Sequence, residues 1–111
     1  MSYISITQAR QMISLFKELK PGLLSPGYPQ STLPNCETFS KSELEHIFEV
    51  TGCQQFRVYS GMDENNQVRS IIVGVNDDGV DIVPEDGEDN LILISDERCP
   101  DICPPNSPIN P

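Results

Sequence analysis

The hydrophobic pattern of this chain changes its period near residue 53, and this change limits the fold more than any other feature of the sequence. In residues 6–19, apolar side chains recur at three- and four-residue steps, as they do on one face of a helix. In residues 55–60 and 68–75 they alternate instead, as they do in a half-buried strand. Helices followed by strands predict an α+β domain, with two N-terminal helices on one face of a sheet.

Both predicted helices have recognisable ends. Ser5 and Gln8 have the spacing of a capping box for the first helix, and Pro21-Gly22 is expected to end it. Ser40 and Glu43 have the same capping-box spacing for the second helix, and Gly52 is expected to terminate it. Between the two helices, residues 21–39 hold four prolines and two glycines without any period, so we expect a long loop that packs on the domain.

The second half of the chain reads as an antiparallel meander of three or four strands. Three alternating or apolar segments, residues 68–75, 80–83 and 91–95, follow the first strand at 55–60. The turn at 76–79 contains Asp78-Gly79, a strong hairpin signal. We therefore predict a single domain over residues 1–98, followed by an extended tail.

Residues 99–111 form this Cys- and Pro-rich tail, which contains five of the ten prolines. Prolines favour an extended course with few backbone donors, and such a segment loses little entropy when it docks. One interpretation is that the tail packs along its own domain, at the edge of the last strand. The others are that it binds a partner or that it is a disordered end. The candidate contact residues are Pro100, Pro104, Pro105 and Pro108.

The net charge of -10 belongs to the second half of the chain. Residues 1–60 carry five basic and five acidic side chains, whereas residues 61–111 carry two basic and twelve acidic ones. This distribution disfavours nucleic acid and favours either a merely solvated surface or contact with a basic protein. The acidic contact candidates are Asp77, Asp78, Glu85 and Asp86.

The N-terminal residues lack the pattern of a signal peptide, and no apolar stretch is long enough to cross a bilayer. The sequence therefore predicts a cytoplasmic protein without a membrane partner, and it leaves the oligomeric state open. In that compartment disulfides are uncommon, so cysteines are interpreted first as thiols or metal ligands.

Four cysteines are candidates for a zinc site, a disulfide or unpaired thiols. Cys99 and Cys103 form a C-x-x-x-C, which is looser than the usual zinc knuckle, and Cys36 and Cys53 lie far apart on either side of the second helix. A disulfide between Cys99 and Cys103 and a set of unpaired thiols both remain open.

No catalytic motif is present, and no cofactor or catalytic residue is predicted. The acidic turns do not match a calcium-binding loop, and there is no phosphate-binding glycine loop or nucleophile elbow. An enzyme remains an alternative only if a pocket near residues 21–39 brings together Tyr28, His46 or Tyr59.

The "RVY" strand, the "IIVGVNDDG" hairpin and the tail "CPDICPPNSPIN" follow one another in an order that resembles a family of small bacterial proteins with a Cys-Pro-rich end. The resemblance covers roughly residues 48–110. It implies that the tail is a regular part of the domain, and it brings no assigned activity, cofactor or site residue.

The sequence therefore predicts a non-enzymatic protein-interaction domain that uses an acidic face and the Pro-rich tail. The alternatives are a small zinc- or thiol-based module built on Cys99 and Cys103, and the enzyme described above.

Overall fold

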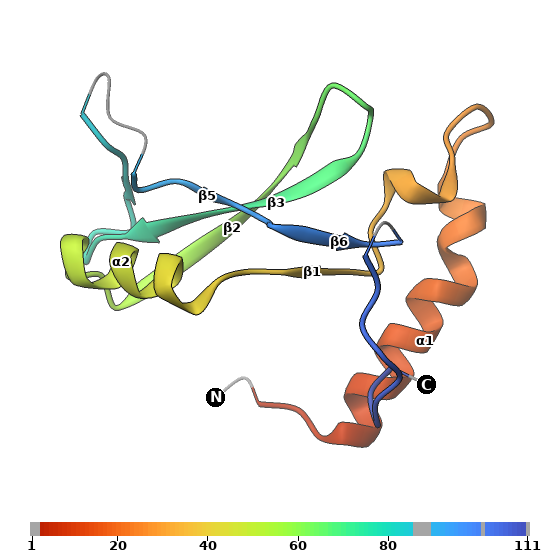
Figure 1. Cartoon of the computed structure of the whole chain (residues 1–111). Coiled ribbons are helices and arrows are strands. Elements are labelled where there is room, and N and C mark those ends of the chain that lie inside the picture. Colours follow the sequence, from red (N-terminus) through yellow and green to blue (C-terminus); the bar gives the residue numbers. More distant parts are fainter. Residues whose placement is uncertain (1–2, 86–89, 101, 111) are drawn as a thin grey trace.

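The computed structural model describes residues 3–85, 90–100 and 102–110 of the chain. Helices α1 (Ile6–Leu23) and α2 (Lys41–Thr51) occur together with antiparallel sheets, so the predicted α+β class is confirmed. The helices do not both precede the strands, because β1 (Cys36–Thr38) lies between them. Figure 1 shows the strands at one end of the molecule and α1 extending away from them.

The strands form two sheets instead of one meander. In the four-stranded sheet, β3 (Val68–Val75) pairs along its whole length with β2 (Gln55–Met62), while β4 (Asp81–Ile82) and β5 (Leu93–Ile94) share its other edge. In the two-stranded sheet, β6 (Glu97–Cys99) returns to pair with β1. The predicted order is therefore right from β2 to β4 and wrong afterwards, because β5 goes back to β3.

The hairpin between β3 and β4 closes as its sequence predicts. The backbone amides of Asp78 and Val80 donate to the Asn76 side chain, over distances of 2.9 and 3.0 Å. Gly79 has a φ of 79°, which glycine adopts without the steric cost that a Cβ brings.

Helix α1 begins as predicted and ends later. Both hydrogen bonds of the capping box between Ser5 and Gln8 are present, each 3.0 Å long. The predicted end at Pro21 is wrong, because α1 continues through this proline to Leu23. Only the last turn loses an amide donor, and the buried Lys20 fixes that turn by donating to the Leu33 carbonyl at 2.9 Å.

For helix α2 the predicted C-terminal end is correct, whereas the predicted N-terminal capping box is wrong. Gly52 adopts the left-handed conformation and donates its amide to the Phe48 carbonyl at 2.9 Å. Ser40 is the N-cap residue, but its side chain makes no capping hydrogen bond, and its hydroxyl lies 2.9 Å from that of Ser42. The expected capping box with Glu43 is therefore absent.

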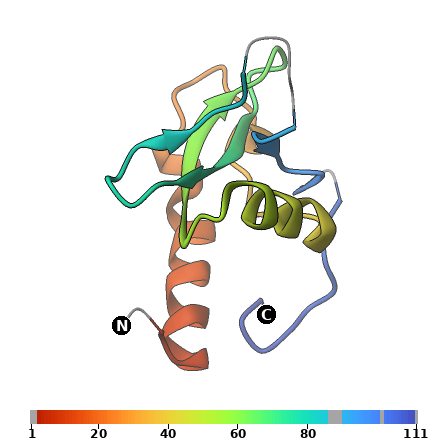
Figure 2. The same cartoon turned by 90° about the vertical axis from the view of Figure 1, so that its left-hand side faces the viewer.

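The core lies between α2 and the four-stranded sheet. Ile47 of α2, Ile72 of β3 and Leu93 of β5 form a buried cluster. Partly buried side chains of Phe39, Leu44 and Cys53 surround it. Helix α1 stands apart from this core, so the expectation that both helices pack on one face of the sheet is not confirmed (Figure 2).

Residues 21–39 are more ordered than the predicted loop. They contain the end of α1, the short 3-10 helix η1 (Gln30–Thr32) and β1. The sequence does not predict β1, because three residues are too few to show an alternation. Its partner β6 includes Cys99, the first residue of the predicted tail.

Candidate functional site

The C-terminal tail folds back onto α1. The Arg10 guanidinium donates from Nε to the Pro108 carbonyl at 2.5 Å, and the Lys17 ammonium donates to the side chain of Asn110. Ser107 and Asn110 exchange two backbone hydrogen bonds of 3.0 Å, which close the last turn. The tail therefore packs along its own domain, but against α1 and not at the edge of the β5 strand.

A cavity of about 400 Å³ lies between α1, the β1–β6 pair and the tail. Its walls are mainly apolar, and five polar side chains lie among them. The apolar lining comes from Ile13, Cys36, Cys99, Pro104, Pro105 and Ile109, and the polar lining from Lys17, Asn35, Asn110 and two further tail residues. Two of the predicted partner-binding prolines thus face the chain's own helix.

The structure contains one of the cysteine arrangements that the sequence left open, a disulfide. Cys99 and Cys103 form a disulfide with a Cα–Cα distance of 4.5 Å. Cys36 and Cys53 are free thiols, and Cys36 lies directly opposite Cys99 in the β1–β6 register. Over the residues that the structure describes, no group of three or more His, Cys, Asp or Glu side chains could hold a metal ion.

A polar cluster joins the two sheets, and its acidic member is Glu37 of β1. Its carboxylate accepts hydrogen bonds of 2.8 Å from the Ser70 amide and from the Ser95 hydroxyl, and a further one from the Ser70 hydroxyl. Burial alone raises the pKa of Glu37, but these hydrogen bonds and the charge of Arg98 outweigh it, so its pKa is lowered.

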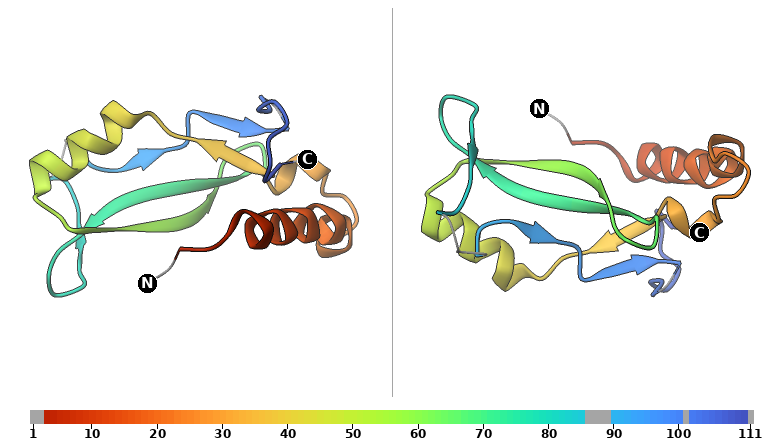
Figure 3. Two further views of the ribbon diagram at one scale, coloured as in Figure 1. Left: turned by 90° about the horizontal axis from the view of Figure 1, so that it is seen from below. Right: turned by 90° about the horizontal axis from the view of Figure 1, so that it is seen from above.

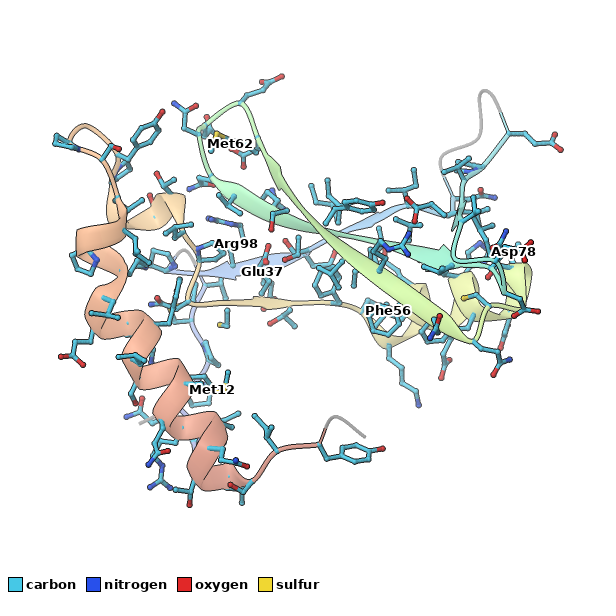
Figure 4. All side chains as sticks on the ribbon, turned by 180° about the vertical axis from the view of Figure 1, so that it is seen from behind. Met12, Glu37, Phe56, Met62, Asp78 and Arg98 are labelled. Atoms are coloured by element: carbon cyan, nitrogen blue, oxygen red, sulfur yellow. A yellow bond between two sulfur atoms is a disulfide. The ribbon has the colours of Figure 1, made fainter. Side chains whose placement is uncertain are left out.

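Arg98 of β6 is the basic member of this cluster and is only 4% exposed. It donates to the carbonyls of Val68 at 3.0 Å and Ser31 at 2.9 Å, and more weakly to that of Thr32. Arg98 thereby connects β3 to η1, which leads from α1 into β1. Figure 4 shows Glu37 and Arg98 near the middle of the molecule, between the helix and the long strands.

We expect replacement of Glu37 by Gln to lower the free energy of unfolding by about 1 kcal/mol at pH 7, since three charge-assisted hydrogen bonds weaken at a partly exposed site. A lowered native pKa means that the carboxylate stabilises the folded chain above the ordinary value of 4.5 and that this contribution is lost as the pH falls through the native pKa. Urea unfolding of both proteins between pH 7 and pH 2 measures the difference. A difference that stays constant over this range contradicts the assignment.

The acidic candidates lie away from α1. Asp77 and Asp78 are exposed in the turn between β3 and β4, and Glu85 is exposed beyond β4. Asp86 lies outside the described residues. Pro100 and Pro108 are exposed in the tail.

The residues of the predicted enzyme alternative lie on three different elements. His46 of α2 lines a cavity of about 280 Å³ with Ser42 and Glu43, whereas the Tyr59 hydroxyl on β2 donates to Asp81 at 2.5 Å. Tyr28 is exposed in the loop after α1. In the described ranges the structure does not bring these three side chains into one cavity.

The sequence predicts one apolar stripe on α1, but the structure divides its side chains between two stripes. The first stripe, formed by Ala9, Ile13 and Phe16 together with Lys20, is at least partly buried. The second, which we call the free stripe, consists of Met12, Leu15, Leu19 and Leu23, and each of its side chains is between 52 and 65% exposed. Spacings of three and four residues place these four side chains on one face of the helix.

Strand β2 also exposes apolar side chains. Phe56, Val58 and Met62 point to the same face of the sheet and are between 50 and 58% exposed. One edge of β2 pairs with β3, and in the described part of the chain no strand pairs with its other edge. Every second residue of the eight-residue β2 directs its backbone N–H and C=O groups to this edge, and these groups are available for pairing.

Within the described ranges, neither helix combines the length and the apolar composition that a bilayer span requires. No family model, no curated protein and no solved structure matches this chain. The resemblance to small bacterial proteins with a Cys-Pro-rich end therefore stays a prediction, and function has to be argued from the surface itself.

Proposed function

We propose that this chain is a non-enzymatic protein-interaction domain whose contact surface is formed by the free stripe of α1 and by β2. The main support for this proposal is the large exposed surface area of the whole chain. The chain exposes 8015 Å², whereas a folded monomer of 12.3 kDa is expected to expose about 6,100 Å². Its radius of gyration is 16.0 Å, against about 13 Å for a compact domain of this length.

The excess of about 1,900 Å² exceeds the roughly 800 Å² that each partner contributes to a standard protein–protein interface. This excess belongs to the chain as a whole, and the free stripe and β2 contribute exposed apolar side chains to it. Exposed apolar side chains that lie together are typical of contact sites. The polar chemistry of the chain supports the same proposal, because Glu37, Arg98 and Lys20 are all used in holding the fold together.

In this proposal the tail supports the contact surface, and the acidic turn is a second, separate surface. Tail residues 104–110 contact α1 and complete the domain, so they support the contact surface from the opposite side of the helix. The exposed Asp77 and Asp78 remain a second surface, suited to a partner with a basic face.

Photo-crosslinking in the cells of origin tests the proposal. A photoreactive phenylalanine analogue replaces Leu15 of the free stripe, or Val50, which is 57% exposed on α2 and serves as a matched apolar helix position outside the surface. We expect discrete cross-linked protein bands from position 15 and none of them from position 50. The absence of discrete bands, or identical bands from both positions, contradicts the proposal.

A further inference from the structure

We infer that the partner on this surface is a second copy of the chain, bound about a two-fold axis through the free stripe of α1 and the open edge of β2. The inference rests on the proposed function and specifies its partner. Three observations carry it: the arrangement of the two elements, the area that they leave uncovered, and the distribution of charge.

The free stripe and the open edge of β2 lie on the same side of the molecule. In both views of Figure 3, β2 lies between α1 and β3, so its unpaired edge faces the side on which α1 stands. Figure 4 labels Met12 on α1, and Phe56 and Met62 near the two ends of β2. A single partner surface can therefore contact both elements.

The tail leaves this side of α1 open. Arg10 and Lys17, which hold the tail, lie on one flank of the partly buried stripe, and the free stripe lies on the other flank. Figure 1 shows the tail in front of α1. The tail thus covers the flank that carries Arg10 and Lys17, whereas the apolar free stripe stays exposed.

The uncovered area fits two identical subunits. The chain as a whole exposes about 1,900 Å² more than a compact monomer of its mass, and an interface of standard size removes roughly 800 Å² from each partner, so a contact between two copies is compatible with the exposed area. An isologous contact uses the same surface twice, so an open strand edge pairs with its own copy and an apolar helix stripe packs on its own copy. Eight residues without proline or lysine in β2 are a favourable edge for such pairing.

Charge distinguishes a second copy from a basic partner. Two chains of charge -10 repel each other unless they meet through a neutral surface. The free stripe carries no charge, and Arg57, the single charged residue of β2, is paired with Asp81 at 2.5 Å. The acidic residues Asp77 and Asp78 lie in the turn between β3 and β4, outside this surface.

Sedimentation equilibrium of the full chain tests the inference. We expect the wild-type protein to have twice the chain mass of 12.3 kDa, with little dependence on salt. The double variant Leu15→Glu/Leu19→Glu is expected to sediment at the single-chain mass, because it places four charges in the contact of a pair. Val50→Glu adds the same kind of charge to an exposed apolar helix position and is expected to keep the double mass.

Hydrogen exchange of the wild-type protein gives a second readout that does not depend on a variant. In the pair, the outward amides of β2 are expected to exchange slowly, whereas an unpaired edge exchanges rapidly. A wild-type protein that sediments at 12.3 kDa with rapidly exchanging β2 amides overturns the inference. If the photoreactive residue at position 15 still cross-links to a different protein in cells, the proposed function stands. If it cross-links to nothing, both the proposed function and the inferred pairing of two copies are overturned.

Discussion

Replacing Arg98 by alanine is expected to lower the free energy of unfolding by about 3 kcal/mol or more, the largest effect of any single polar substitution in this chain. The substitution removes donors from the Val68 and Ser31 carbonyls and the positive charge beside Glu37. Because Arg98 is buried, water cannot replace these hydrogen bonds without opening the contact between η1 and β3.

Equilibrium urea unfolding of the wild type and Arg98→Ala measures this effect. Arg57→Ala is the matched control, because Arg57 also donates to a carbonyl, that of Gly79, and pairs with the Asp81 carboxylate, but does so at the surface. We expect a much smaller loss for the control, since exposed ion pairs contribute little. Equal losses for the two arginines contradict the structural role assigned to Arg98.

Replacing Gly74 by alanine is expected to destabilise the fold by about 1–3 kcal/mol, because β3 passes closely under the end of α2 at this position. A Cβ on Gly74 comes within 2.9 Å of the Cys53 sulfur and 3.4 Å of the Thr51 hydroxyl. Neither neighbour moves easily, since Thr51 donates to the Ile47 carbonyl at 2.6 Å and accepts from the Cys53 amide at 3.2 Å.

Thermal or urea unfolding of two further proteins makes this prediction specific. Gly61→Ala also adds a methyl group to a long strand, but the close atom is the terminal methyl of Ile71, which can rotate away, so we expect a change below about 1 kcal/mol. The double variant Gly74→Ala/Cys53→Ala removes the sulfur and should be more stable than the sum of its single substitutions predicts. Strict additivity argues against the steric explanation.

Features that depend on neighbouring residues could be predicted from the sequence. The capping box at Ser5, the left-handed Gly52 and the hairpin at Asn76 all form as expected, because each is made by hydrogen bonds between residues two to four apart. The caps and the hairpin cost little to form locally and need no help from distant segments. Strands β2 and β3 also form and pair with each other. Their burial does not alternate as expected, because Phe56 and Val58 are exposed, whereas the neighbours Ile72 and Val73 are both buried.

The capping box at Ser40 is a local feature that was predicted wrongly. The other errors occur where distant contacts outweigh local preference. α1 passes Pro21 because Lys20 is fixed by the loop that leads into β1. Strand β1 exists because β6 returns to pair with it, which no local pattern in three residues reveals. The tail lies on α1 and not on β5, since Arg10 and Lys17 supply donors there.

The candidate surface was the least predictable part of the molecule. A helix with apolar residues on two adjacent faces looks like a core helix, and the sequence does not show which of the faces its own domain leaves uncovered. The proposed surface therefore follows from the exposure of Met12, Leu15 and Leu19, whereas the acidic turn could be read from composition alone.

The sequence by itself determined the α+β class, the position and type of most elements, the turn chemistry and the acidic second half, because periodicity, capping and charge are local properties. Only the tertiary structure decided how α1 stands relative to the sheets, which cysteines pair, and which apolar side chains remain exposed. These depend on contacts between residues such as Arg98 and Ser31, which are far apart along the chain, and their free energy is gained only when the whole chain has folded.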